Sequence, residues 1–397
     1  MIRMNNLQAT GWDLSDLKHI ELDAQSLARY RLKHGDLLFN RTNSKELVGK
    51  CEVFKEDGDW VFASYLIRVQ LAAENVLPEF VSSFLNSPAG RIQIDQVSRQ
   101  IAGMSNVNAE ELKRLEVPLP SLDIQRRLVA ELDDARRRRD GALTDAGRLV
   151  ASFEPWAIAQ IGMVQTVPTF RNYYAVRRTS LSVRIDPFYY APEFVEIERE
   201  VRSVAHAPLG DLVDFSNITW NPSEHPDTTF RYIEISGVDR RRGKAKASEV
   251  LVTDAPSRAR MLVEPNDILV SLTRPHHGSI ALLDEGHRGC IASTGFAVIR
   301  HVDSTRIDRR FLWATLRLSI CLKQMLRRAS GGNYPAITQD ELANVLIPVP
   351  TKPIQQAILK EIMRRSDEAD RLESHAESTW DEARTRFEQQ LLRMNAA

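Results

Sequence analysis

The residues with the greatest capacity for chemistry are clustered cations. Residues 239–246, DRRRGKAK, form the densest basic loop outside the long helical stretches of the sequence. Arginine forks bind phosphate oxygens and can also pair with two acceptors of guanine, so we predict that this loop contacts DNA, mainly through phosphates. A solvated surface turn is the alternative. The predicted contact residues are Arg240, Arg241, Arg242, Lys244 and Lys246.

Two polar loops follow similar Asp-x-Leu segments. Residues 273–278, TRPHHG, follow Asp267, and residues 41–45, RTNSK, follow Asp36. Their positions correspond while their sequences differ, as reading two different base sequences would require, although any exposed loop can diverge. A Gly-rich loop at 330–334 is a further candidate. The DNA contacts predicted in these loops are Arg274, Asn333, Tyr334, Arg41, Asn43 and Lys45.

No group of residues meets the requirements of catalysis, metal binding or cofactor binding. His276 and His277 are adjacent but lack a third ligand at a suitable spacing. Asn221-Pro222 is not followed by the aromatic residue of an adenine-methyltransferase motif, and neither a G-x-G-x-x-G motif nor a phosphate-binding loop is present. We therefore predict no catalytic residue, no cofactor and no metal ion.

The composition indicates a cytoplasmic protein with local rather than global charge. The 397 residues include 53 Lys and Arg and 53 Asp and Glu, so any polyanion must bind a segment and not the whole surface. The three cysteines form no C-x-x-C pair, which fits a reducing compartment. The sequence contains neither a signal-peptide pattern at its start nor an apolar run of about 18 residues. We expect no membrane association.

The elements that position the loops occur twice. Residues 117–120, VPLP, recur as residues 347–350, IPVP, and the same shift pairs Ile124-Gln125 with Ile354-Gln355. Such self-similarity predicts an internal twofold repeat. Ile2 already aligns with Ile233, so we expect an N-terminally shortened first copy.

A long amphipathic helix is predicted after each Pro-x-Pro segment. Apolar residues recur at intervals of three, four or seven, and an antiparallel pair of such helices would separate two globules as a spacer. Gly141, Gly147 and Pro155 weaken or end the first helix. The predicted seam residues are Ile354, Ile358, Ile362, Leu372, Ala376, Trp380, Ile124, Leu128, Leu132 and Val150.

Each copy alternates short β-branched segments with short helical ones, which is typical of a mixed α/β globule. The predicted class is therefore α+β, with two mixed α/β domains separated by a pair of long antiparallel coiled-coil-like helices. The predicted boundaries are 1–121 for the shortened first domain, 122–165 for the first long helix, 166–350 for the second domain and 351–397 for the second long helix.

The chain resembles the specificity subunits of type I restriction-modification systems. The hinges at 347–358 and 119–125 are similar to the family's transition from domain to helix, and residues 331–337, GGNYPAI, and 184–190, RIDPFYY, are similar to segments of its recognition domains. The resemblance implies two target-recognition domains that read a bipartite target in double-stranded DNA. It also implies a non-catalytic subunit that recruits two adenine-methyltransferase subunits and that a motor-nuclease subunit can join.

Two other classes stay open. A helical scaffold or anti-restriction decoy would not read DNA, and the basic loops in both copies disfavour it. A DNA-modifying enzyme would need methyl-donor and catalytic motifs, which this sequence lacks. Salt-dependent DNA binding and a methyl-transfer assay separate these alternatives.

Overall fold

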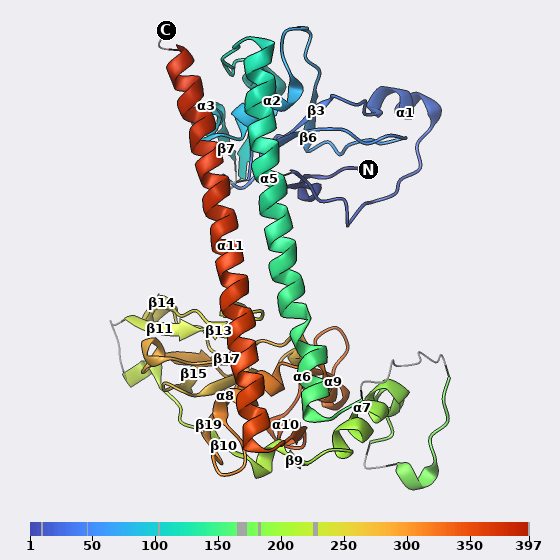
Figure 1. Cartoon of the computed structure of the whole chain (residues 1–397), viewed down its shortest axis with the longest axis vertical. Helices are drawn as coiled ribbons and strands as arrows, with labels where there is room; N and C mark the ends of the chain where they lie inside the picture. The colour runs from blue at the N-terminus through green and yellow to red at the C-terminus, as the bar shows by residue number, and fades with distance from the viewer. Residues whose placement is uncertain are drawn as a thin grey trace. The chain divides into compact units, whose positions relative to one another are not determined.

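The computed structural model describes residues 1–397 except 9–10, 46, 102–103, 165–172, 182–183, 225–228 and 396–397. Helices and strands alternate along the described chain, which confirms the predicted α+β class (Figure 1). The chain forms two compact units, one of residues 1–146 with 370–397 and one of residues 147–369. The four-part division at 121, 165 and 350 stays a prediction, and residue 165 lies outside the described residues.

The first unit combines short antiparallel sheets with small helices. Its strands are β1 (Leu7–Gln8), β2 (Gly11–Trp12), β3 (Leu37–Asn40), β4 (Thr42–Asn43), β5 (Cys51–Val53), β6 (Leu66–Val69), β7 (Arg99–Ile101) and β8 (Met104–Asn106). Its shorter helices are η1 (Met4–Asn6), α1 (Ala24–Tyr30), α2 (Pro78–Leu85), α3 (Pro88–Val97) and α4 (Ala109–Leu112). The strand orders are β1-β2, β5-β3-β6 and β4-β8-β7.

Strand β3 is the centre of the first unit because it is buried on both faces. Leu37 and Phe39 belong to one apolar cluster and Leu38 to another, as the alternation of side chains along a strand requires. Helix α2 covers the first cluster with Phe80. The ring of Phe387, from the last part of α11 (Lys352–Asn395), lies 5.9 Å from that of Phe80. The C-terminal part of the chain is thus built into the first unit's core.

The second unit contains two four-stranded sheets, ordered β10-β19-β16-β17 and β14-β11-β18-β15. Its strands are β9 (His206–Pro208), β10 (Val213–Ser216), β11 (Thr229–Ile233), β12 (Val238–Asp239), β13 (Lys244–Ala245), β14 (Ser248–Leu251), β15 (Ala259–Leu262), β16 (Ile268–Ser271), β17 (Ile280–Leu282), β18 (Ile291–Ser293), β19 (Phe296–Val302) and β20 (Leu346–Pro348). Its α-helices besides the long ones are α6 (Phe153–Ile161), α7 (Pro192–Arg202), α8 (Arg309–Leu316), α9 (Ser319–Arg328) and α10 (Gln339–Ala343). Its 3-10 helices are η2 (Arg178–Ser180), η3 (Pro187–Tyr190), η4 (Leu209–Asp211), η5 (Pro222–Glu224), η6 (Ile235–Gly237), η7 (Val252–Asp254), η8 (Pro275–His277) and η9 (Glu285–His287).

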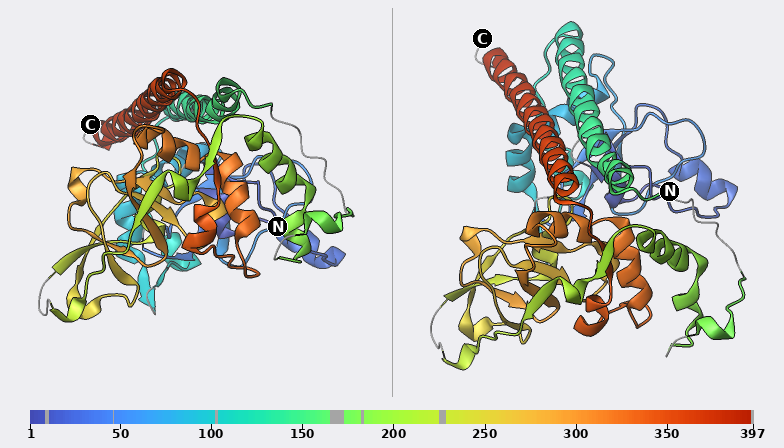
Figure 2. Two further views of the ribbon diagram at one scale, coloured as in Figure 1. Left: turned by 90° about the horizontal axis from the view of Figure 1, so that it is seen from below. Right: turned by 60° about the horizontal axis from the view of Figure 1, so that its bottom comes forward.

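Strand β16 holds the second unit together in the same way as β3 holds the first. Ile268 and Val270 face one apolar cluster, and Leu269 faces the other. Asp267, just before the strand, is buried and pairs with Arg300 at 2.7 Å. Helix α7 packs beside α9 on the same unit (Figure 2). These elements leave the loops at the ends of β12 and β16 at the surface.

The long helices are α5 (Leu122–Ala151), which is followed by α6, and α11. Gly141 and Gly147 lie inside α5 without ending it, while the helix breaks at Ser152. Pro155 has no N–H to donate to the carbonyl of Ala151, which explains the break. The coiled-coil pairing and the repeat over whole halves stay predictions.

A buried glutamine anchors the start of each long helix. Gln125 and Gln355 are both fully buried. Each accepts a hydrogen bond from one backbone N–H and donates to two backbone carbonyls, at 2.8–3.0 Å. One of these carbonyls belongs to the last proline of the hinge, Pro120 or Pro350. An equivalent set of three hydrogen bonds therefore sets the orientation of each helix relative to its own domain.

Candidate nucleic-acid interface

The predicted basic loop is a tight hairpin between β12 and β13. The Asp239 carboxylate accepts the backbone N–H groups of Arg241 and Arg242 at 2.9 and 3.0 Å. Partial burial opposes ionisation, but the hydrogen bonds from Arg242 and Arg241 hold the pKa of Asp239 below its usual value. Arg240, Arg241, Lys244 and Lys246 are exposed, and Arg242 is half-buried. The turn therefore presents cations on an ordered backbone.

Trp313 of helix α8 and Arg317, which directly follows the helix, support this hairpin, a contact that the sequence did not predict. The Arg317 guanidinium donates to the carbonyls of Arg240 and Arg241 at 3.1 and 2.5 Å and lies 4.6 Å from the ring centre of Trp313. Burial lowers the pKa of Arg317 to about 10. Gly243 has a φ of +63°, and a Cβ there would lie 2.6 Å from the Trp313 ring. Only glycine fits in this turn against the side chains of Trp313 and Arg317.

The structure brings two of the predicted loops together. Arg240 Nε donates to the Ser279 hydroxyl at 3.2 Å, which joins loop 239–246 to the end of loop 273–278. Burial and the nearby charges of Arg240 and Arg274 lower the pKa of His277, so this imidazole is neutral at pH 7. Separate segments of the sequence thus contribute to one cationic face.

Arg274 and Tyr334, predicted on separate loops, are in contact. The Arg274 guanidinium lies 4.0 Å from the ring centre of Tyr334, and its Nη2 donates to the Asn333 carbonyl at 3.1 Å. The Arg274 backbone is left-handed, with φ 47° and ψ 54°, and its N–H donates to the Pro335 carbonyl at 2.7 Å. Such a backbone costs energy for a residue other than glycine and is concentrated at functional sites. Tyr334 is 69% exposed, so the stack lies at the surface.

The equivalent loop of the first unit is built differently. Thr42 and Asn43 form β4, which pairs with β8 in a sheet. Arg41 is half-buried, with its backbone bonded to Tyr65 and Val107. Lys45 is exposed. The predicted residues therefore lie on or beside a small sheet.

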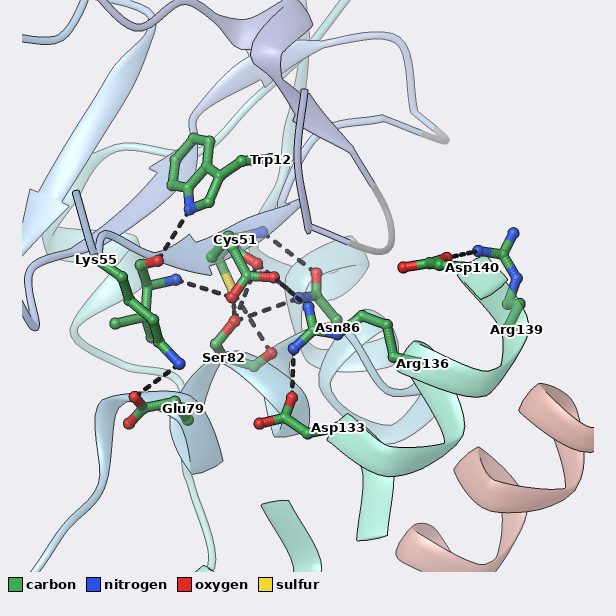
Figure 3. A network of polar contacts seen from close by, with 12 residues as sticks. Trp12, Cys51, Lys55, Glu79, Ser82, Asn86, Asp133, Arg136, Arg139 and Asp140 are labelled. Atoms are coloured by element: carbon green, nitrogen blue, oxygen red, sulfur yellow. Dashed lines mark hydrogen bonds and ion pairs between the residues drawn. The ribbon is translucent and has the colours of Figure 1, made fainter. Parts of the chain in front are cut away.

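Beside β5, the first unit contains a polar network centred on the backbone of Cys51 (Figure 3). Asn86 donates to the Cys51 carbonyl at 2.6 Å and accepts its N–H at 3.2 Å, and the Ser82 hydroxyl donates to the same carbonyl. Burial raises the pKa of the Cys51 thiol to about 12 and also raises that of Cys321. Both thiols are therefore protonated and unsuited to nucleophilic chemistry.

The arginines 136–139 of α5 form ion pairs within the first unit. Arg136 pairs with Asp133 and, at 3.0 Å, with Glu52, whereas Arg139 pairs with Asp140 and with Glu377 of α11 (Figure 3 shows Asp133 and Asp140). These side chains hold elements of the unit together. The run of four arginines is consequently a weaker DNA-contact candidate than the hairpin of the second unit.

Metal-ligand clusters and membrane-spanning helices are absent from the part of the chain that the structure describes. Among these residues, no three or more His, Cys, Asp and Glu side chains are grouped in a way that could hold a metal ion. No described helix combines the length and the apolar character needed to cross a bilayer.

Comparison with known proteins points to one family. The profile of the Type I restriction modification DNA specificity domain matches residues 207–378. A specificity subunit assigned to the MjaX type I restriction enzyme of Methanocaldococcus jannaschii is 24% identical over 92% of this chain and 80% of its own. The family segment and this relative, which matches most of both chains, support a specificity subunit of a type I restriction-modification system. The EcoKI specificity subunit of Escherichia coli K12 is 29% identical over 34% of this chain and 29% of its own length.

Among solved structures, the HsdS subunit from Thermoanaerobacter tengcongensis is 32% identical, with a TM-score of 0.37 over 44% of this chain and 45% of that one. In this specificity subunit, the matched family segment includes loops 239–246, 273–278 and 330–336. The best-ordered candidate contacts thus lie within the part of the chain that carries the family's DNA specificity domain.

In the specificity subunit, many predicted seam residues pack on a domain rather than on a helix alone. Leu128 and Leu132 belong to the first unit's core, and Ile358 belongs to the second unit's core. Partly buried seam residues that pack against one of these cores are Ile124, Trp380, Ile354 and Ile362. Ala376 is buried, whereas Leu372 and Val150 are partly buried. The apolar stripe therefore also fastens each helix to a globule.

Proposed function

We propose that the second unit reads one half of a bipartite sequence in duplex DNA through the face formed by loops 239–246, 273–278 and 330–336. The observation that carries this proposal is the convergence of these loops: Arg240 bonds to Ser279, and Arg274 stacks on Tyr334. The chain itself supplies recognition and no catalysis.

Two kinds of contact are assigned to this face. The exposed Arg240 and Arg241 side chains suit phosphate oxygens, which position a protein on the duplex without reading its sequence. Arg274 is held by its stack and its backbone, so we assign it to base reading in the major groove, where arginine pairs with guanine. A pre-ordered guanidinium loses little side-chain entropy when it binds.

The first unit, on this proposal, reads the other half through Arg41, Asn43 and Lys45, and the long helices set the number of unread base pairs between the halves. The partners are two adenine-methyltransferase subunits and, in a nuclease-competent complex, a motor-nuclease subunit. The equal numbers of acidic and basic residues support this division of labour. Partners that contact phosphates would provide the counter-charge that this chain lacks.

The hairpin is tested by replacing Arg240, Arg241 and Arg242 with Ala in the complex with methyltransferase subunits. We expect weaker DNA binding, and a slope of log affinity against log salt that is shallower by about 0.9 for each phosphate that the variant no longer neutralises. The matched control is Arg310→Ala, an exposed arginine on the same unit. An unchanged slope in the triple variant would exclude the hairpin from the interface.

The scaffold or decoy alternative is tested by mapping methylated adenines in genomic DNA with and without the gene. One bipartite methylated motif that depends on the gene supports DNA reading, and its absence favours a scaffold. Methyl transfer by the purified chain alone would instead support the enzyme alternative.

A further inference from the structure

The last residue of α9, Arg328, carries a buried charge that lacks a close, hydrogen-bonded carboxylate. Arg328 is only 7% exposed, and its Nη1 has no hydrogen-bond partner in the described part of the chain. Its closest carboxylate oxygens, on Glu198 and Glu341, are both 3.9 Å away, which is too long for a hydrogen bond. A buried guanidinium without such bonds is costly and requires an explanation.

Glu198, whose carboxylate is the nearest to Nη2 of Arg328, already pairs with two other arginines. Glu198 pairs with Arg202 at 2.8 Å and also with Arg327. Burial opposes its ionisation, but the bond from Arg202 and the charges of Arg327 and Arg328 keep the pKa of Glu198 below its usual value. One carboxylate thus faces three arginines, and the positive charge around it exceeds the negative charge.

Arg328 borders an open pocket of about 460 Å³ in the second unit. Arg184 and Arg202 line the same pocket, while Glu341 is its only carboxylate among the described residues. The Arg184 guanidinium donates to the Arg328 carbonyl at 2.9 Å, so the two arginines are held at one place. The pocket is open to solvent and has many times the space that one ordered water needs, so a small polyatomic anion can enter it.

We propose that this pocket binds a phosphate group, with Arg328 as the central ligand and Arg184 and Arg202 at its sides. A tetrahedral dianion would add acceptors for the arginines that line the pocket and would balance the excess of positive charge. Free phosphate compounds and the backbone of DNA share this chemistry. The test has two parts. The part with free phosphate is independent of the proposed function, whereas the part with DNA rests on it.

The first part measures thermal unfolding of the full chain against inorganic phosphate, at constant ionic strength maintained with chloride. We expect the midpoint to rise by about 3–5 °C for each tenfold increase in phosphate above its dissociation constant. Arg328→Met fills similar space without charge and should lose this response, measured as the shift from its own midpoint in the absence of phosphate. Arg310→Met, an exposed arginine outside the pocket, should keep it.

The second part measures salt-dependent DNA binding by the complex that contains Arg328→Met. A slope shallower by about 0.9 identifies a backbone phosphate as the ligand, while an unchanged slope with loss of the phosphate response identifies a free phosphate compound. The proposal is overturned if Arg328→Met changes neither the phosphate response nor the slope. Absence of DNA binding by the parent complex would instead contradict the proposed function, with the first part still decisive for the pocket.

Discussion

The two units share a central strand but differ at its neighbours. β3 pairs with β5 and β6, and the corresponding β16 pairs with β17 and β19. In the second unit the other edge of β19 is covered by β10, whereas β6 has no second strand partner in the described part of the first unit. The second unit is therefore the more extensively paired scaffold, and a loop held by a well-paired sheet presents its side chains in a better-defined geometry.

The loops after the central strands show the same contrast. Thr42 in the first unit extends a three-stranded sheet, while Thr273 in the second makes only an isolated bridge to Ala336 before the Arg274–Tyr334 stack. Related positions thus support different surfaces, as recognition of two different half-sites needs. Each of the following experiments compares the two units.

The largest expected effect is on half-site recognition. Randomising the half-site read by the second unit should weaken binding by the complex about 10³-fold or more, and randomising the other half should weaken it less. The measurement is competition binding at one fixed salt concentration. Equal losses would show that the first unit discriminates as well despite its smaller sheets.

Truncating one buried side chain in the core of each unit should show whether the two units unfold separately. Phe80→Ala and Phe311→Ala each remove a fully buried ring, at an expected cost of about 3–5 kcal/mol. In chemical denaturation, each variant should shift the transition of its own unit. A common shift of one transition by both variants would mean that the two units unfold as one.

Replacing either buried glutamine at the start of a long helix should lower the stability of the protein by a similar amount. Gln125→Ala and Gln355→Ala each leave a backbone N–H without its acceptor, with an expected cost of about 1–3 kcal/mol. Gln93→Ala, a control in the first unit, removes bonds at an exposed site and should cost less. A clear difference between Gln125→Ala and Gln355→Ala would show that the matching bonds have unequal energetic roles.

Substitution of the stacked arginine should change base preference more than overall affinity. Arg274→Lys keeps the charge but loses the planar fork, so discrimination at one base pair should fall by about 1–3 kcal/mol. Arg41→Lys is the matched change in the first unit. Selection from a randomised half-site gives the measurement, and an unaltered second-half preference in Arg274→Lys would exclude Arg274 from base reading.

The smallest effect concerns acid stability at α11. Hydrogen bonds from Arg364 and Arg365 lower the pKa of Glu361 to about 2, compared with about 4.3 in an unfolded chain. The stabilisation is thus present above about pH 4.3 and is lost as the pH falls towards 2. Glu361→Gln should slightly flatten the decline of stability over this interval. Glu131→Gln, at the equivalent position in α5, is the matched control. Equal curves of stability against pH for the parent and Glu361→Gln would refute the stabilising role of Glu361.

The α+β class and the positions of many elements could be predicted without the structure. Among the segments that favour strands, the continuous apolar run 268–271 forms β16, and among those that favour helices, apolar residues at helical spacing form α2. The family also followed from duplicated local motifs. These features depend on residues close together in the chain, so a linear reading can find them.

Which candidate residues are in contact depends on how the folded chain packs. Arg317 lies 77 and 76 positions beyond Arg240 and Arg241, whose carbonyls it binds, and Arg184 lies 144 positions before Arg328. No periodicity links such residues, because their contact depends on how strands and helices pack and not on their spacing. The same is true of the stack between Arg274 and Tyr334. The sequence identified charged loops, while packing decides which arginines are buried, stacked or exposed.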